Sequence, residues 1–197
     1  MGPRCVILLG AIAACGPKPE PAKVVPQTMP ERIAADFEKA VKTSKDEYVS
    51  LFDFVAVGQY EILIHRYDLN GRFPNLPDDV RERFEKEDGT PYPPERERRN
   101  VGNFYTILAQ RTVGTGGCKG GEPLTEYGKQ LGQEFEPLPE GTPPGYEILR
   151  GAANGYLAKG GVAGIRCSGG KGGLAVVYTE RPNARGYELI TIYDDSE

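Results

Sequence analysis

The sequence is poor in the residues that most metal sites need, and it has no excess of positive charge. Its 197 residues include one histidine, no tryptophan and four cysteines. A single histidine excludes a histidine-rich metal site. The longest apolar run is too short, and too isolated, for a protein that crosses a membrane several times. The formal net charge is −4, so the chain lacks the basic surface that is typical of nucleic-acid-binding proteins.

The first residues have the composition of a secretory signal. Arg4 is followed by a run of uncharged, mostly apolar residues at 6–14. As a helix this run would be about 14 Å long, against a hydrocarbon core of about 30 Å, so it is too short to span a bilayer. A short apolar run after a positive charge predicts the central part of a signal peptide.

The run ends in Ile12, Ala13, Ala14 and Cys15, which resembles the lipobox of bacterial lipoproteins. The resemblance implies that residues 1–14 are removed as a signal peptide and that Cys15 is lipidated. Each buried methylene group contributes about 0.8 kcal/mol, so several acyl chains hold a protein firmly at a membrane. The alternative is an ordinary signal peptide cut after Ala13, which would release a soluble protein.

The residues that follow predict a location and a tether. By the same resemblance, Gly16 in place of aspartate implies transfer to the outer membrane if the host is Gram-negative. Residues 16–30 contain five prolines, which favour an extended, solvated chain. We therefore expect a cell-envelope protein attached to the membrane through Cys15. Residues 15–30 would form the lipidated cysteine and its tether, and another envelope protein is a candidate partner.

The other cysteines predict a disulfide. Cys5 leaves with the signal peptide, so Cys118 and Cys167 are the thiols left in an oxidising compartment. A disulfide between them would close a loop of about 50 residues and stabilise the fold by about 4 kcal/mol in the chain-entropy model. A redox or nucleophilic thiol is the alternative, but the sequence shows neither a C-x-x-C pair nor a neighbouring histidine.

Residues 31–197 predict one α+β domain, with helices first and strands last. The first helix is expected to begin at Pro30, because proline is favoured in a first turn. Its apolar residues recur at helical spacing: Ile33, Phe37 and Val41. A second helix is expected to begin at Asp46 and to continue to about Arg66, although β-forming residues at 52–57 leave a strand open there. Its buried face should comprise four apolar residues: Tyr48, Leu51, Phe52 and Val55.

Helical spacing also predicts helices over 95–110 and 124–131, with a glycine-rich loop at 114–121 between them. The charges that alternate in sign at 95–99 are expected to form a solvated helix start. Four strands are predicted after Pro137: 146–149, 156–167, 174–180 and 187–193. The turns between them lie at 151–155, 168–173 and 182–186. These predict an antiparallel meander with helices against one face of the sheet.

This order of elements, with Ala40, Val41 and Lys42 and then residues 46–52 opening the domain, resembles the nuclear-transport-factor-like (cystatin-like) fold. The resemblance covers residues 31–66. Members of that family include enzymes, ligand binders and protein-interaction modules, and the resemblance assigns no catalytic residue to this chain.

His65 is the candidate catalytic residue, because a histidine oriented by a carboxylate such as Asp68 or Asp53 can act as a general base near neutral pH. The alternative is a structural His65 that hydrogen-bonds at the edge of the core, since no nucleophile motif lies nearby. One histidine and a disulfide leave too few ligands for zinc, and no glycine-rich segment matches a cofactor-binding motif. We therefore expect a binding or interaction module without metal or cofactor, with an envelope enzyme that uses His65 as the alternative.

Overall fold

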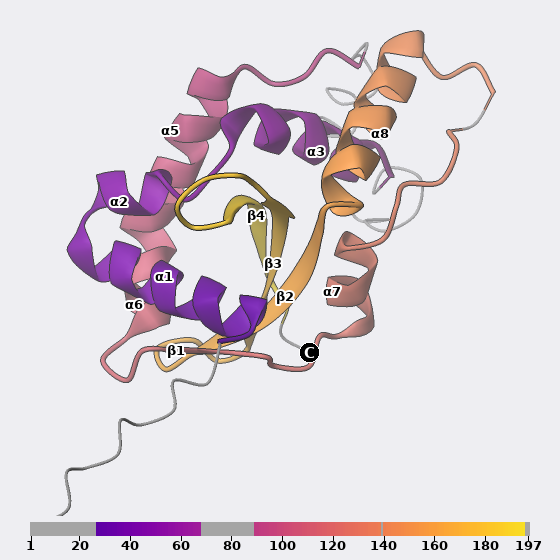
Figure 1. Cartoon of the computed structure of the whole chain (residues 1–197). Helices are drawn as coiled ribbons and strands as arrows, with labels where there is room; N and C mark the ends of the chain where they lie inside the picture. The colour runs from indigo at the N-terminus through magenta and orange to yellow at the C-terminus, as the bar shows by residue number, and fades with distance from the viewer. Residues whose placement is uncertain (1–26, 68–88, 139, 196–197) are drawn as a thin grey trace, which may run out of the picture.

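The computed structural model describes residues 27–67, 89–138 and 140–195, and its helices lie around one antiparallel sheet (Figure 1). The described strands have the order β1-β2-β3-β4. They are β1 Cys118–Gly120, β2 Gly160–Cys167, β3 Gly173–Glu180 and β4 Tyr187–Asp194. The helices are α1 Met29–Thr43, α2 Lys45–Val49, α3 Phe54–Tyr67, α5 Pro94–Phe104, α6 Gln110–Val113, α7 Glu126–Leu131 and α8 Pro144–Leu157, and a π-helix, η2 Tyr105–Ala109, joins α5 to α6. The predicted α+β class is confirmed.

The first helix begins near the predicted position. Pro30 lies in the first turn of α1, and the Glu31 carboxylate accepts a hydrogen bond of 2.7 Å from the Thr28 backbone N–H. Proline and an acidic residue in these positions stabilise a helix N-terminus. The predicted apolar stripe is buried in the core: Ile33, Phe37 and Val41. Through this face α1 packs on β1 and β2.

The long helix expected from residue 46 is instead two helices. Ser44 caps α2, because its side chain accepts a hydrogen bond of 3.1 Å from the Glu47 backbone N–H. Asp46 lies inside α2 as an exposed residue. α2 ends at Val49, and α3 begins only at Phe54. The expected start at Asp46 is therefore wrong, since a serine two residues earlier takes the capping position.

Asp53 starts the second of these helices. Its Oδ1 accepts hydrogen bonds of 3.0 and 3.1 Å from the backbone N–H groups of Val55 and Ala56. Just before it, Phe52 forms an isolated bridge with Leu189 of β4, so the β-forming stretch pairs with the sheet at one residue before it turns helical. Val55 is 53% exposed. The prediction that it lies on the buried face is wrong, because the break between α2 and α3 changes which residues face the core.

Helices bury both faces of the sheet. Along β3, Leu174 and Val176 pack in one core with α1 and α2, whereas Ala175 and Val177 pack in a second core with α3, α7 and α8. Successive residues of a strand point to opposite faces, so consecutive buried apolar residues require cover on both sides. The expectation of helices against one face is therefore wrong, and the apolar run at 174–177 is the signal that could have corrected it.

α8 occupies residues that were expected to form a strand at 146–149 and a turn at 151–155. Its buried residues have helical spacing: Tyr146, Leu149, Ala153 and Leu157. Glycine lowers helix propensity, but an apolar face that packs on a sheet outweighs that cost. The expected strand at 156–167 is accordingly shorter, since β2 begins only at Gly160.

The remaining elements follow the sequence more closely. β3 and β4 match the strands predicted at 174–180 and 187–193 to within one residue, and they pair antiparallel. The helix predicted over 95–110 is present as α5, η2 and α6. β1 lies inside the glycine-rich segment 114–121, where only a loop is expected; it pairs antiparallel with β2.

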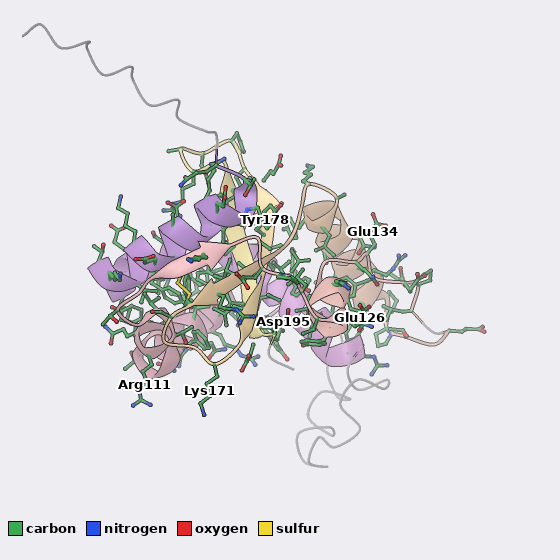
Figure 2. All side chains as sticks on the ribbon, turned by 90° about the horizontal axis from the view of Figure 1, so that it is seen from below. Arg111, Glu126, Glu134, Lys171, Tyr178 and Asp195 are labelled. Carbon is green, nitrogen blue, oxygen red and sulfur yellow. A yellow bond between two sulfur atoms is a disulfide. The ribbon has the colours of Figure 1, made fainter. Side chains whose placement is uncertain are left out.

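Cys118 of β1 and Cys167 of β2 lie opposite each other and are joined by a disulfide (Figure 2). The Cys118 backbone N–H also donates a hydrogen bond of 2.8 Å to Glu38 of α1. The hydrogen bond from Lys42 lowers the pKa of Glu38, and the one from Cys118 lowers it further. The short edge strand is thus fixed to its neighbour by a covalent bond and to α1 by a charge-assisted hydrogen bond.

Candidate functional site

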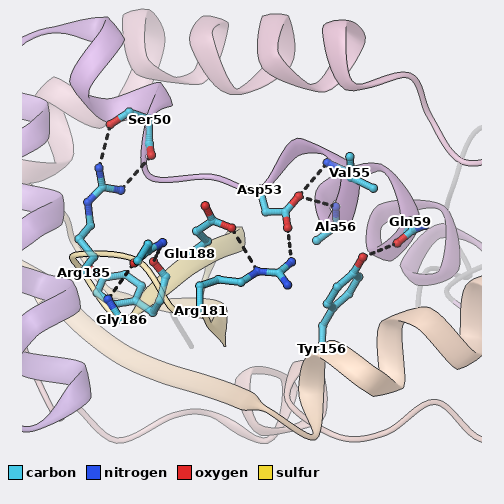
Figure 3. Close-up of polar contacts among 12 residues, drawn as sticks. Ser50, Asp53, Val55, Ala56, Gln59, Tyr156, Arg181, Arg185, Gly186 and Glu188 are labelled. Carbon is cyan, nitrogen blue, oxygen red and sulfur yellow. Dashed lines mark hydrogen bonds and ion pairs between the residues drawn. The ribbon is translucent and has the colours of Figure 1, made fainter.

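Asp53, one of the residues predicted for a catalytic site, belongs to a network that holds the fold together (Figure 3). Besides capping α3, its carboxylate forms an ion pair with Arg181, which directly follows β3. The Arg181 Nε lies 3.2 Å from Glu188 Oε2 on β4. The Arg181 guanidinium lies 5.3 Å from the centre of the Tyr156 ring on α8. The network connects α3, α8, β3 and β4, so its geometry gives Asp53 a structural role.

The structure does not bring Asp53 to His65. Asp53 directly precedes α3, and His65 lies in its last turn, 12 residues further along (65 − 53). At 1.5 Å per residue the two positions are about 18 Å apart along the helix, too far for the carboxylate to orient the imidazole. The side chain of His65 and the whole of Asp68 lie outside the described residues, so their pairing stays a prediction.

A cavity of about 230 Å³ lies between α3, α5 and β4. α3 and α5 lie side by side above the sheet in the view of Figure 1, and α3 also contacts β4. The wall is mostly apolar and includes four aromatic side chains: Tyr48, Phe52, Tyr92 and Phe104. The carboxyl groups of Glu61 on α3 and Glu97 on α5 line the same cavity. Apolar walls with a few convergent polar groups are typical of small-molecule sites.

Glu61 is held in this cavity by two hydroxyl groups of β4. Thr191 Oγ1 donates a hydrogen bond of 2.5 Å to Oε1, and Tyr193 Oη donates one of 2.8 Å to Oε2. Burial raises the pKa of Glu61 above its ordinary value; the two hydrogen bonds oppose this shift, and the charge of Glu97 adds to it. The protein therefore favours the neutral form of this carboxyl group more than water does.

Glu97 is buried and incompletely hydrogen-bonded. It is 4% exposed, and its Oε2 accepts one long hydrogen bond of 3.4 Å from Asn100 Nδ2. No described residue donates a hydrogen bond to Oε1; the Arg96 Nε lies 3.5 Å from it, within ion-pair distance. The Arg96 guanidinium carbon lies 3.5 Å from the centre of the Tyr92 ring. A buried carboxylate oxygen without a hydrogen bond is costly, which marks Glu97 as a functional candidate.

Sequence reasoning missed both carboxylates. The interpretation of residues 95–99 as a solvated helix start is wrong for Glu97, although its four neighbours in that run are exposed. A helix that packs against the protein must turn one residue of such a run inwards, and charge alternation does not show which one. The sequence gives a better indication of Glu61, because this residue directly precedes the apolar run 62–64, which is buried in the structure.

Comparisons of the chain with protein-family models, with curated proteins and with solved structures give no match. The resemblances to bacterial lipoproteins and to the nuclear-transport-factor-like fold therefore stay predictions, and residues 1–26, with Cys15, lie outside the described residues. Within the described ranges, no helix combines the length and the apolar character needed to cross a bilayer. No three His, Cys, Asp or Glu side chains gather there as metal ligands would.

Proposed function

We propose that the chain is a lipid-anchored cell-envelope protein that acts as a binding module, with the cavity between α3, α5 and β4 as its binding site. The observation that supports this most is Glu97, which is 4% exposed while its Oε1 accepts no hydrogen bond from the described residues. A ligand with a donor group would satisfy this oxygen, and the apolar wall would cover the rest of the ligand. The lipobox resemblance at residues 12–15 supports the anchor.

Catalysis by His65 has less support in the geometry. Asp53 is engaged by the α3 cap and by Arg181, which argues against a role as the orienting carboxylate. A general base contributes about 10²–10⁴-fold in rate, so an essential His65 would be costly to remove. We expect His65→Ala and His65→Gln to complement a deletion strain as well as the wild-type protein does. If both variants are folded and membrane-attached and yet fail, the enzyme becomes the better hypothesis.

Filling the cavity tests the binding site directly. Val101 of α5 lines the cavity, so Val101→Phe would place a ring where the ligand is proposed to lie. Val55→Phe makes the same exchange at an exposed position of α3, where Val55 is 53% exposed. We expect Val101→Phe not to complement the deletion strain and Val55→Phe to complement it, when both variants are present at equal levels in the membrane fraction. Full function of Val101→Phe would show that this cavity is not the binding site.

A further inference from the structure

We infer that the ligand of this cavity is an organic cation, with a primary ammonium or guanidinium group on a compact apolar body. The inference rests on the binding function proposed above and adds the chemical class of the ligand. Three charged side chains line the cavity: Glu61, Arg96 and Glu97. Two of the three are acidic, and Glu97, which is 4% exposed, has an oxygen that accepts no hydrogen bond from the described part of the chain. An anionic ligand would lie beside a buried carboxylate and be repelled.

Arg96 already shows how this site holds a cation. Its guanidinium lies over the face of Tyr92, and its Nε lies 3.5 Å from Glu97 Oε1. An aromatic face and a carboxylate are the two groups that recognise ammonium and guanidinium ions best. The Arg96 side chain is nevertheless 46% exposed, and neither it nor any other residue in the described ranges donates a hydrogen bond to Glu97 Oε1. A ligand cation placed deeper in the cavity could donate the hydrogen bond that Arg96 does not.

The volume of the cavity limits the rest of the ligand. A dry cavity of about 150 Å³ is large enough to bind benzene, and this cavity measures about 230 Å³. It therefore has room for one six-membered ring and a short chain that ends in the cationic group. The apolar side chains available to such a ring include Phe52, Val57, Phe104 and Ile190. The 2-phenylethylammonium ion has this size and this distribution of charge, and it is a suitable probe.

Calorimetric titration of the full chain in non-ionic detergent micelles tests the inference. The two probes are 2-phenylethylammonium and 2-phenylethanol, which have the same shape but differ in charge. We expect the ammonium probe to bind about tenfold or more tightly than the alcohol, because a hydrogen bond to a charged group is the stronger kind. Glu97→Gln should remove this preference, whereas Glu95→Gln, at an exposed position of the same helix, should keep it. All proteins are titrated in the same micelles, so partition of each probe into detergent is the same for every variant, and the change in preference between variants does not depend on it.

Arg96→Ala provides a second variant that changes an exposed side chain. It should raise the affinity for the ammonium probe several-fold, because it removes the competing guanidinium; a loss of affinity would overturn the inference. If both probes bind equally and Val101→Phe blocks both, the cavity is a binding site but not one for cations. If neither probe binds, both the inference and the proposed cavity fail.

Discussion

Asp53 stabilises the fold in two ways, as the N-cap of α3 and as the ion-pair partner of Arg181. Asp53→Ala should lower the free energy of unfolding by about 2 kcal/mol, since a lost N-cap costs about 1 kcal/mol and Arg181 loses a half-buried partner. Urea denaturation measures the change. Asp46→Ala is the matched control, because Asp46 is exposed and caps nothing; its effect should stay below about 0.5 kcal/mol. Equal effects of the two variants would contradict the capping role.

Glu61 should make stability depend on pH in the direction opposite to that of a salt-bridged carboxylate. Burial raises its pKa in the folded state above the ordinary 4.5, so the folded protein binds this proton more tightly than the unfolded chain does. The resulting stabilisation is complete below the ordinary pKa and is lost as the pH rises through the folded-state pKa. Thr191 and Tyr193 of β4 donate hydrogen bonds to Glu61, and the charge of Glu97 on α5 raises its pKa further.

Glu61→Gln replaces the titratable carboxyl group with a neutral amide and so tests the prediction. The stability of the variant relative to the wild type should increase between about pH 4 and about pH 8, because only the wild type bears the cost of ionising a buried carboxyl group. Chemical denaturation at both pH values measures the two differences. Carboxylates elsewhere, such as Glu38, titrate in both proteins and cancel. A difference that does not change with pH would mean that the pKa of Glu61 is not raised.

Helices and strands whose apolar residues recur at regular spacing are predicted well from the sequence. Elements that depend on contacts between residues far apart in the sequence are not. The stripe Ile33, Phe37 and Val41 suffices to predict α1, and alternation with adjacent turns suffices for β3 and β4. β1 is only three residues long, and it forms a strand by pairing with its neighbour β2, where Cys118 lies opposite Cys167 and is joined to it by the disulfide. No local pattern in a glycine-rich segment encodes that pairing.

The candidate site is harder to predict than the fold for the same reason. Glu61 and Glu97 are 36 residues apart (97 − 61) and lie on different helices. They share a cavity only because α3 packs against α5 and both lie beside β4. The sequence draws attention to His65 instead, because a lone histidine is easy to see, whereas a glutamate that turns inwards from a charged helix start is not.

The helix α8 can be tested directly, because its glycines lead the sequence analysis to predict a turn at 151–155 in its place. An added Cβ at Gly151 or at Gly155 meets no atom within 4 Å. Because both glycines lie at exposed positions of α8, Gly151→Ala and Gly155→Ala should each raise the free energy of unfolding by about 0.5–1 kcal/mol. Gly164→Ala on β2 is the opposing control, since its Cβ would lie 2.1 Å from the Glu122 backbone oxygen. Destabilisation by the α8 variants would argue for the turn that the glycines suggest.

For the molecule as a whole, the proposed anchor makes membrane attachment depend on one thiol. Cys15→Ala should move the protein from the detergent phase to the aqueous phase in a phase-separation assay, because each lost acyl methylene removes about 0.8 kcal/mol of membrane affinity. Cys5→Ala is the matched control: it changes the same residue type within the predicted signal peptide and should leave partition unchanged. Detergent-phase partition that survives Cys15→Ala would refute lipidation at this position.

The strand order also sets how such an anchored molecule would present its cavity. β1 and β4 are the two outer strands of the sheet, about 14 Å apart at the usual strand spacing. α1 begins beside β1, where the Pro30 backbone oxygen lies against Gly120. The cavity lies beside β4. A tether that leads into α1 would therefore join the folded domain beside β1, whereas the proposed binding site lies beside β4, so a ligand could arrive from the aqueous space without first reaching the bilayer.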